Sequence, residues 1–600
     1  MSDAQMSGTR LALRRQDGYC PIGDYAVLGD GRTVALVATD GRVDWWPVPA
    51  LDAPPVCAAI LEPQAGGYIQ VVPVGQYQLS RAYIEGTNVL ETTYTCETGC
   101  ARVTEALNSG TAGRLPWNEL ARLIEVTEGT VEMALDVFPG DRFGQASPFT
   151  DAHDGTPVIR VGDQMLAVVT EGFTLTEVGP VRVRGTARIE GSGKALVAVI
   201  ATDDEPLFVP SAAEVEKRLH ATICSWKRWS ETLPSDGPWA GAVRRSALAL
   251  KSLFFEPTGA ISAAATTSLP ERVGGRKNYD YRYGWLRDTS FTLDAFMNLG
   301  LREETHAAVS WMINAICRTA PQLHVFYTLA GRVPNEEAEL DVPGYRRSRP
   351  VRAGNSASGQ TQLGVYGDLF DTMFKYVEAG HVLDDSTSRL LADLANQCCD
   401  AWRQKDSGIW ELPDLQHYTI SKIGCWVALD RACKLADAGQ IGARSTKRWR
   451  HEAQTIKDWV DTNCWSSAQR SYTFYAGTEK LDAAVLLAGR TGFETGERLS
   501  GTIDAVVRQL AKGPMVFRYT GMQEQEGAFV ACTFWLVSAL VHNGQRDRAA
   551  ELMDQGLGLA NDLGLLSEQI SPGTGELLGN VPQGLSHLAL VNAAHALARR

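Results

Sequence analysis

Two short stretches of the chain place a glutamate where it could act on a sugar. Residues 408–411 (GIWE) and 566–569 (LSEQ) each set one carboxyl beside apolar or aromatic residues, just before a long helical pattern. Glycoside hydrolysis requires two such groups, because one must protonate the leaving oxygen and the other must activate water. An apolar contact with Trp410 would raise the pKa of Glu411, which makes Glu411 the candidate acid and Glu568 the candidate base. A lone Trp-Glu pair is ordinarily a surface carboxylate beside a core aromatic, so both candidates depend on their neighbours.

A second group of residues has the chemistry to hold a hexose. Trp285, Arg287 and Asp288 offer an aromatic face, a planar guanidinium and a carboxylate in one short stretch, which suits a sugar ring and its vicinal hydroxyls. The alternative is a structural Arg-Asp pair that caps the following helix. Arg518 adds a further guanidinium, and Tyr281 could bring a phenolic oxygen to a developing oxocarbenium ion.

Composition limits the class of partner. The chain has 600 residues, 44% of them hydrophobic, and a net charge of −13, so we expect two to four domains with packed cores. The negative charge argues against nucleic acid or an anionic membrane as the main partner. A neutral small carbohydrate fits better, because 15 Trp and 17 Tyr suit stacking on sugar rings, although they equally suit a large core.

Neither a signal peptide nor a membrane span is expected, and the protein is predicted to be cytoplasmic, with homo-oligomers left open. The 12 Cys are scattered and are expected to be reduced. Cys96 and Cys100 bracket a turn and could form a disulfide bridge, but no second Cys pair or His cluster lies near them. We therefore expect no metal site and no cofactor.

The first third of the chain has a sequence pattern that is typical of an antiparallel β-sandwich. Segments rich in Val, Thr and Ile alternate with Gly-containing turns, at 33–37, 68–74, 89–94, 123–126, 131–137, 167–169 and 181–189. Ser211 and Glu214 then form a capping-box pattern that predicts a linker helix. The expected domains are 1–208 (β-sandwich), 209–238 (linker helix) and 239–600 (helical).

The helical part shows twelve runs, and six helical hairpins can close into a double ring of inner and outer helices. The runs lie at 239–254, 287–299, 303–319, 363–379, 384–405, 419–436, 445–465, 480–487, 499–511, 527–542, 545–560 and 586–600; the eighth pattern is weak. The loops with candidate catalytic or sugar-binding residues precede the second, fourth, sixth, tenth and twelfth runs. Alternate helices start at the same end of such a ring, so these loops should converge on one mouth.

These residues resemble glycoside hydrolase family 15, the glucoamylase family, in the bacterial form that includes trehalases and glucodextranases. The similarity extends from 19–25 (YCPIGDY) and 40–45 (DGRVDW) to 587–592, and its most specific pieces are 278–288, 408–411 and 568–587. The resemblance implies a β-sandwich joined to an (α/α)6 barrel. It also implies an inverting, exo-acting α-glucosidase with Glu411 as general acid and Glu568 as general base, about 6.5–9.5 Å apart. The residues implied to bind substrate are Tyr281, Trp285, Arg287, Asp288, Trp410, Arg518 and Gln569.

Three departures from the family pattern put the leaving group in doubt. Leu412, Pro413 and Asp414 follow the acid where many bacterial members have a Glu-x-Arg-Gly pattern, the segment 339–345 is one residue shorter and lacks a histidine, and Gly364 stands where an aspartate is usual. The main prediction is release of β-glucose from short α-glucosides or α-glucans, with trehalose not the sole substrate. The alternatives are a trehalase acting on α,α-trehalose and a non-catalytic carbohydrate-binding protein.

Overall fold

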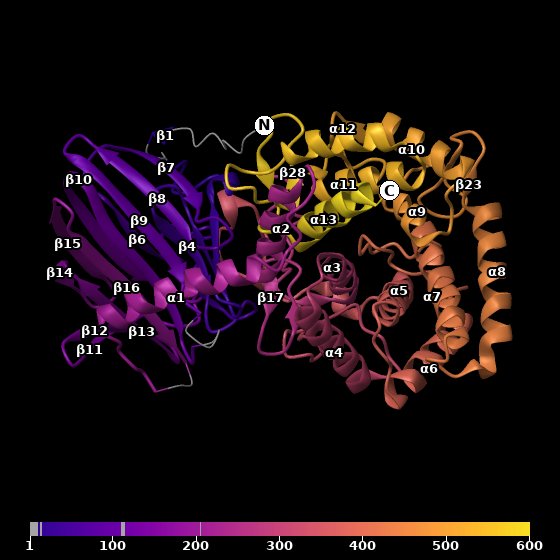
Figure 1. Cartoon of the computed structure of the whole chain (residues 1–600), viewed down its shortest axis with the longest axis horizontal. Helices are drawn as coiled ribbons and strands as arrows, with labels where there is room; N and C mark the ends of the chain where they lie inside the picture. Colours follow the sequence, from indigo (N-terminus) through magenta and orange to yellow (C-terminus); the bar gives the residue numbers. More distant parts are fainter. Residues whose placement is uncertain (1–9, 12–14, 110–114, 204–205, 600) are drawn as a thin grey trace.

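The computed structural model describes residues 10–11, 15–109, 115–203 and 206–599. Within these residues the chain forms an N-terminal β-rich domain followed by a helical region, as the sequence predicted. Figure 1 shows the strands at one end of the molecule, the helices from α2 onward at the other, and α1 lying along the strands.

The strands of the N-terminal domain pair antiparallel throughout. Their bounds are β1 (Arg10–Leu11), β2 (Ala26–Gly29), β3 (Val34–Val37), β4 (Arg42–Pro47), β5 (Pro55–Cys57), β6 (Gly67–Pro73), β7 (Tyr77–Tyr83), β8 (Leu90–Cys96), β9 (Gly99–Leu107), β10 (Asn118–Pro139), β11 (Phe149–His153), β12 (Thr156–Val161), β13 (Gln164–Glu171), β14 (Thr174–Val178), β15 (Val183–Glu190) and β16 (Lys194–Thr202). Cys96 and Cys100 flank the turn between β8 and β9, and both are free thiols.

One strand, β10, connects the two halves of this domain. Its first part pairs with β9 and β16, and its second part pairs with β6 and β15. The sequence predicted two strands here, because Glu128-Gly129 reads as a turn. Instead the pairing register shifts at Val126/Glu128, and Gly129 has a φ of +69°. A β-carbon on Gly129 would lie 2.2 Å from the carbonyl oxygen of Thr98, so a glycine at this bulge bends the strand without ending it.

The predicted linker helix is α1 (Ala212–Ser230), and its capping box is present. The Ser211 hydroxyl accepts the Glu214 backbone N–H, and the Glu214 carboxylate accepts the Ser211 N–H. The helix buries Val215, Leu219 and Trp226 and contacts β10, β13 and β16. Among the described residues, no helix is both long and apolar enough to cross a membrane.

All twelve predicted helical runs are found, with ends that differ by a few residues. The helices are α2 (Ala240–Leu253), α3 (Leu286–Leu299), α4 (Arg302–Thr319), α5 (Gly364–Glu378), α6 (Asp385–Ala401), α7 (Thr419–Asp437), α8 (Thr446–Asn463), α9 (Ala488–Thr491), α10 (Glu497–Leu510), α11 (Val530–His542), α12 (Arg546–Leu557) and α13 (Gly584–Ala598). The weak eighth run is a 3-10 helix, η5 (Ala483–Leu487), which continues into the four-residue α9.

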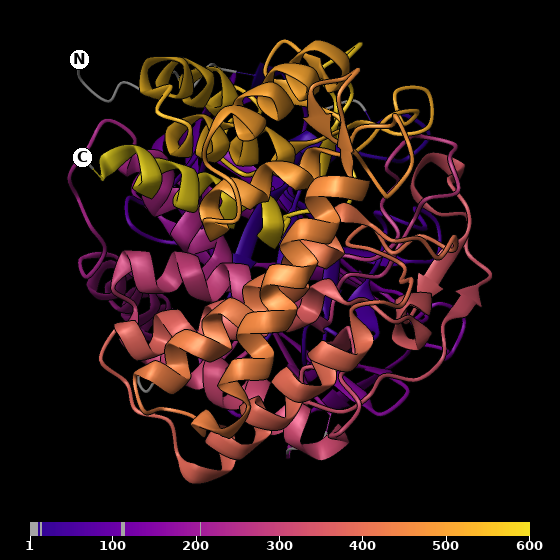
Figure 2. The same cartoon turned by 90° about the vertical axis from the view of Figure 1, so that its right-hand side faces the viewer.

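The helices pack in a closed order. Along one circuit α3 contacts α5, α5 contacts α7, α7 contacts η5 and α9, these contact α11, α11 contacts α13, and α13 returns to α3. The remaining helices pack outside this circuit: α4 on α3, α6 and α8 on α7, α10 on η5 and α11, α12 on α11, and α2 on α13. Figure 2 looks onto this helical region, with most of the strands behind it.

Residues of the N-terminal domain form hydrogen bonds with the chain segments that lead into the circuit of helices. Tyr19 Oη donates to the Gly344 carbonyl at 2.8 Å, and Trp45 Nε1 donates to the Ala265 carbonyl at 2.9 Å. Arg282 Nη1 donates to the Ala53 carbonyl at 2.8 Å. The β-rich domain therefore fixes the backbone next to the segment 278–288, which carries much of the candidate site.

Candidate active site

The loop between α6 and α7 holds Glu411 in an unusual backbone conformation. Glu411 has a φ of +58° and Gly408 a φ of +68°, a region that non-glycine residues rarely adopt. A β-carbon on Gly408 would lie 2.7 Å from the Tyr418 ring. Gln360 Nε2 donates to the Glu411 carbonyl at 3.0 Å. The surrounding residues thus impose the geometry of Glu411, which is common at functional sites.

The carboxyl of Glu411 is bound by residues at the start of α3. Its Oε1 accepts the indole N–H of Trp285 at 2.8 Å and lies 3.6 Å from Arg287 Nη1. The side chain is 14% exposed. Burial raises the pKa of Glu411, whereas Arg287 and the Trp285 hydrogen bond oppose that rise. The sequence assigned the aromatic contact to Trp410, but the hydrogen-bonded indole comes from a residue 126 positions away.

Trp410 instead connects the loop that carries Glu411 to two other segments of the chain. Its indole N–H donates to Asp482 Oδ1 at 2.8 Å, and the guanidinium of Arg518 lies 5.4 Å from its ring centroid. Asp482 is buried and also caps η5 through the Ala484 N–H. Sequence reasoning missed Asp482, because it lies inside the predicted run 480–487, which has the weakest helical pattern and begins in the structure only at Ala483.

Glu568 lies immediately before the central strand of a small three-stranded sheet, next to the circuit of helices. It precedes β28 (Gln569–Ile570), which lies between β27 (Ala528–Phe529) and β29 (Leu577–Leu578). Its Oε2 accepts the backbone N–H of Asn580 at 3.0 Å, and the residue is 1% exposed. Burial raises the pKa of Glu568 to about 7, although the Asn580 N–H and Arg518 oppose this. Gly579 permits the close approach, since a β-carbon there would lie 2.6 Å from the Glu568 side chain.

Tyr281 lies in the field of both candidate carboxylates. Its ring packs edge-on to Trp285, with centroids 5.2 Å apart. Burial raises the pKa of its phenol, and the negative charges of Glu568 and then Glu411 raise it further. The structure therefore brings Glu411, Glu568, Tyr281 and Trp285 into one neighbourhood from three separate loops.

Arg287 and Asp288 form the predicted pair within the first turn of α3. Arg287 Nε donates to Asp288 Oδ2 at 3.1 Å, and Arg287 Nη1 donates to the Ile409 carbonyl at 2.7 Å. Asp288 is the third residue of the helix, so it also lies near the positive end of the helix dipole. The binding and helix-end interpretations of this pair are therefore compatible.

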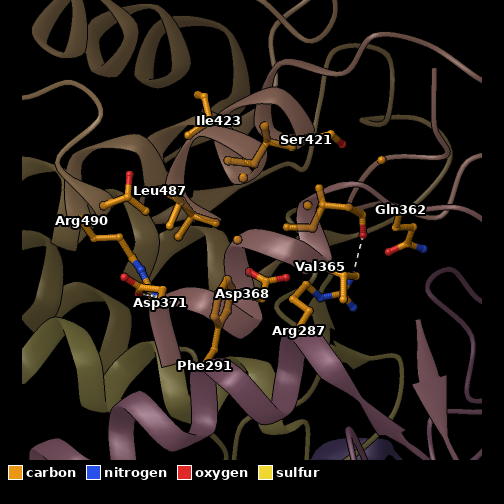
Figure 3. Close-up of a pocket in the computed structure, with 18 residues that line it drawn as sticks. Arg287, Phe291, Gln362, Val365, Asp368, Asp371, Ser421, Ile423, Leu487 and Arg490 are labelled. Atoms are coloured by element: carbon orange, nitrogen blue, oxygen red, sulfur yellow. Dashed lines mark hydrogen bonds and ion pairs between the residues drawn. The ribbon is translucent and has the colours of Figure 1, made fainter. Parts of the chain in front are cut away.

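A cavity of about 60 Å³ lies inside the ring beside Arg287. Figure 3 shows Arg287 at one side, Arg490 and Asp371 at the other, and Asp368 between them. Neither Glu411 nor Glu568 lines this cavity. Its volume suits a few water molecules and is too small for a hexose, so the candidate site is defined by the carboxylates and not by this space.

Arg518 has two carboxylate partners that sequence reasoning did not assign. Its Nε donates to Glu526 Oε1 at 2.6 Å, and its Nη2 donates to Glu271 Oε2 at 2.6 Å. Both glutamates are buried, and Lys277 also pairs with Glu526. Because these bonds fix its guanidinium, Arg518 is a rigid part of the site wall.

Gln569 directly follows Glu568 and is the first residue of β28. Its side chain is fully buried, and within the described part of the chain its amide nitrogen and oxygen have no hydrogen-bond partner. A β-carbon on the adjacent Gly527 would lie 3.2 Å from Gln569 Oε1. Glu568 and Trp285 are buried to the same degree, so the contact of Gln569 with substrate stays a prediction.

Replacing Trp285 by Phe should move the alkaline limb of the pH–activity profile to higher pH. The indole N–H favours the ionised form of Glu411 and so lowers its pKa. Without that hydrogen bond the pKa of Glu411 rises, and a residue that must be protonated stays active to higher pH. A profile of kcat/KM against pH measures the shift, and a downward shift would contradict this account.

Known protein families and curated relatives match most of this chain. The family model described as glycosyl hydrolases family 15 matches residues 237–559, and the model described as trehalase-like, N-terminal, matches residues 13–223. A protein named trehalase from Mycolicibacterium smegmatis is 34% identical over 627 aligned positions, covering 96% of this chain and 91% of its own length. The trehalase of Mycobacterium tuberculosis is 35% identical over 625 positions, covering 96% and 89%. That of Thermoplasma volcanium is 30% identical, covering 97% and 94%.

A solved structure of a bacterial glucoamylase complexed with acarbose has a similar fold. The TM-score is 0.72 at 12% identity, and the match covers 99% of this chain and 97% of the other. The chain belongs to glycosyl hydrolases family 15. It is therefore a glycoside hydrolase, and the third alternative, a non-catalytic binding protein, is not favoured.

Proposed function

We propose that this protein is an inverting trehalase, which hydrolyses α,α-trehalose with Glu411 as general acid and Glu568 as general base. One set of observations carries the proposal: Glu411 and Glu568 come from distant loops, the negative charges of both raise the pKa of Tyr281, and Glu411 accepts a hydrogen bond from Trp285, whose ring packs on that of Tyr281. The relatives named trehalase, similar along nearly the whole chain, favour trehalose as the substrate.

The glucose unit that is attacked is held by Arg287 and Asp288, whose donors and acceptors suit vicinal hydroxyls. Glu411 gives its proton to the bridging oxygen, and the Trp285 N–H stabilises the carboxylate that remains. Glu568 takes a proton from a water molecule, which attacks the anomeric carbon from the opposite face as the bond to the bridging oxygen breaks. The attacked glucose leaves as the β-anomer, and the second glucose leaves as the α-anomer.

The remaining residues hold this arrangement in place. Asp482 fixes Trp410 by one hydrogen bond, and Glu271 and Glu526 fix Arg518 by direct hydrogen bonds. Such preformed geometry stabilises the charge that develops in the transition state without reorganisation. We further propose that the closed circuit of helices is an (α/α)6 barrel, that the strands form a β-sandwich, and that 1–208, 209–238 and 239–600 are the domain limits.

A broader α-glucosidase is the second candidate. Leu412 and Pro413 follow the acid and supply few hydrogen-bond donors. A site that makes few polar contacts with the second sugar discriminates weakly among leaving groups. This observation favours some activity on maltose and isomaltose beside trehalose.

A substrate panel tests the choice between the two. Glucose release is measured from trehalose, maltose, isomaltose and soluble starch under identical conditions. We expect trehalose to have the highest kcat/KM, with the two other disaccharides hydrolysed more slowly. Hydrolysis of maltose or starch with trehalose inert would reject the trehalase proposal and support the second candidate.

A further inference from the structure

Three tyrosines lie on one face of the extended segment that leads into α3. The backbone carbonyls of Tyr279, Tyr281 and Tyr283 accept N–H groups from the neighbouring segment 263–268, at 2.9, 2.8 and 2.9 Å. Residues two apart in an extended chain point to the same side, about 6.6 Å apart. The intervening Asp280 and Arg282 pair with each other at 2.7 Å, and Arg282 reaches the N-terminal domain. The tyrosines therefore follow one another along a single line.

All three tyrosines are half-buried, but they have different neighbours. Tyr283 packs on Phe326, with centroids 5.6 Å apart, and Tyr281 lies in the field of both catalytic candidates. Tyr279 is half-buried, and its centroid is 6.1 Å from that of Tyr281. Burial raises the pKa of Tyr279 to about 12, and Glu271, Arg518, Arg352 and Glu411 are the charges that act on it. Its ring therefore lies beside that of Tyr281, one step further along the line.

Arg352 supports the ring of Tyr279. Its guanidinium lies 5.2 Å from the ring centroid, and its Nη1 donates to the Asn278 carbonyl at 2.7 Å. Its Nε lies 3.0 Å from Glu337 Oε1. A guanidinium held in this way over an aromatic face adds cation–π attraction and fixes the ring in place.

Arg352 belongs to a hairpin that contains one of the departures from the family pattern. Strand β22 (Val351–Ala353) pairs with β21 (Ala338–Leu340), and Arg352 stands opposite Glu339. The shortened segment 339–345 begins in β21 and forms the connection that follows it. A change in the length of this connection alters the hairpin that carries Arg352.

We propose that Tyr279, supported by Arg352, is the platform on which the second sugar of the substrate rests and that this pair determines selectivity for the leaving group. The inference rests on the proposed function, because it assumes that Glu411 protonates the bridging oxygen. If Tyr281 faces the first glucose, the next side chain on the same line faces the next sugar. Aromatic rings are suited to this contact, since the apolar face of a hexose packs on them.

Paired substrates test the platform. Trehalose carries a second sugar, whereas α-D-glucosyl fluoride has a leaving group too small to reach Tyr279. Tyr279→Ala should lower kcat/KM for trehalose at least about tenfold, mainly through KM, and change kcat/KM for the fluoride by less than about twofold. Tyr279→Phe keeps the ring and should stay within about threefold of wild type on both. Arg352→Met should lower the value for trehalose alone by roughly threefold.

Tyr77→Ala is the matched control, because Tyr77 is a half-buried tyrosine of β7 in the N-terminal domain, and it should leave both substrates unaffected. Equal losses on trehalose and fluoride in Tyr279→Ala, or no loss on either, would overturn the platform while leaving the proposed function intact. Wild-type enzyme that hydrolyses the fluoride and not trehalose would overturn the proposed function, and the inference would fall with it.

Discussion

Replacing Glu568 by Gln should abolish turnover while substrate binding stays nearly intact. The carboxamide oxygen can still accept the Asn580 N–H, so the local shape is kept, but the amide cannot take a proton from water. Loss of a general base costs on the order of 10²–10⁴-fold in rate, and we expect the upper end of that range because the second carboxyl is assigned to the leaving group. The measurements are kcat on trehalose and trehalose binding by calorimetry.

The same variant has a second signature that confirms correct folding. Glu568 has a pKa of about 7 in the folded protein and about 4.3 in an unfolded chain. As pH rises from about 4 to 7, the unfolded state releases this proton first, so the residue destabilises the fold increasingly, by roughly 4 kcal/mol above pH 7. Glutamine carries no such charge. The variant should therefore gain stability over wild type between pH 5 and pH 8 in denaturant unfolding.

Glu576→Gln is the control for this substitution, because Glu576 lies in the connection between β28 and β29, with a side chain 30% exposed. It should retain wild-type kcat. Near wild-type turnover in Glu568→Gln would remove Glu568 from the mechanism, whatever its effect on stability.

Replacing Glu411 by Gln should produce a loss that depends on the leaving group. Natural disaccharides need a proton on the bridging oxygen, and we expect kcat on trehalose to fall by about 10²–10⁴-fold. Fluoride departs without protonation, so kcat on α-D-glucosyl fluoride should fall far less. The ratio of the two losses is the readout, measured on the same enzyme preparation.

An equal loss on both substrates would show that Glu411 does not act as the acid. Because the carboxamide of the Glu411→Gln variant would still accept the Trp285 N–H through its oxygen, misfolding of the loop is a poor explanation for selective loss. Circular dichroism and a thermal melt of the variant supply the folding control.

Local patterns were sufficient to predict the helices and the loops that carry chemistry. The runs at 445–465 and 545–560 match α8 and α12 closely, since amphipathic periodicity repeats over several turns. The convergence of loops followed from the count of helices, and the Trp285–Glu411 and Trp410–Asp482 hydrogen bonds agree with it. The candidate catalytic and binding residues were therefore recognised by their residue type and by their location in loops that precede alternate helices.

Pairings across long sequence distances could not be predicted. Nothing next to Glu411 in the sequence indicates that its indole partner is Trp285, and nothing next to Arg518 indicates Glu271. Nothing next to Gln569 in the sequence indicates that its side chain packs beside Gly527. Gly129 was interpreted as a turn residue, because a β-bulge becomes visible only when the pairing with the partner strand is known.

The central claim is inversion at one glucose of trehalose by Glu411 and Glu568, and proton NMR in the first minutes of hydrolysis tests it most directly. Each trehalose contains two α-linked glucose units, and inversion changes only the one that is attacked. The account predicts equal initial amounts of β-glucose and α-glucose, before mutarotation. Accumulation of α-glucose alone would indicate retention and contradict the assignment of the two glutamates.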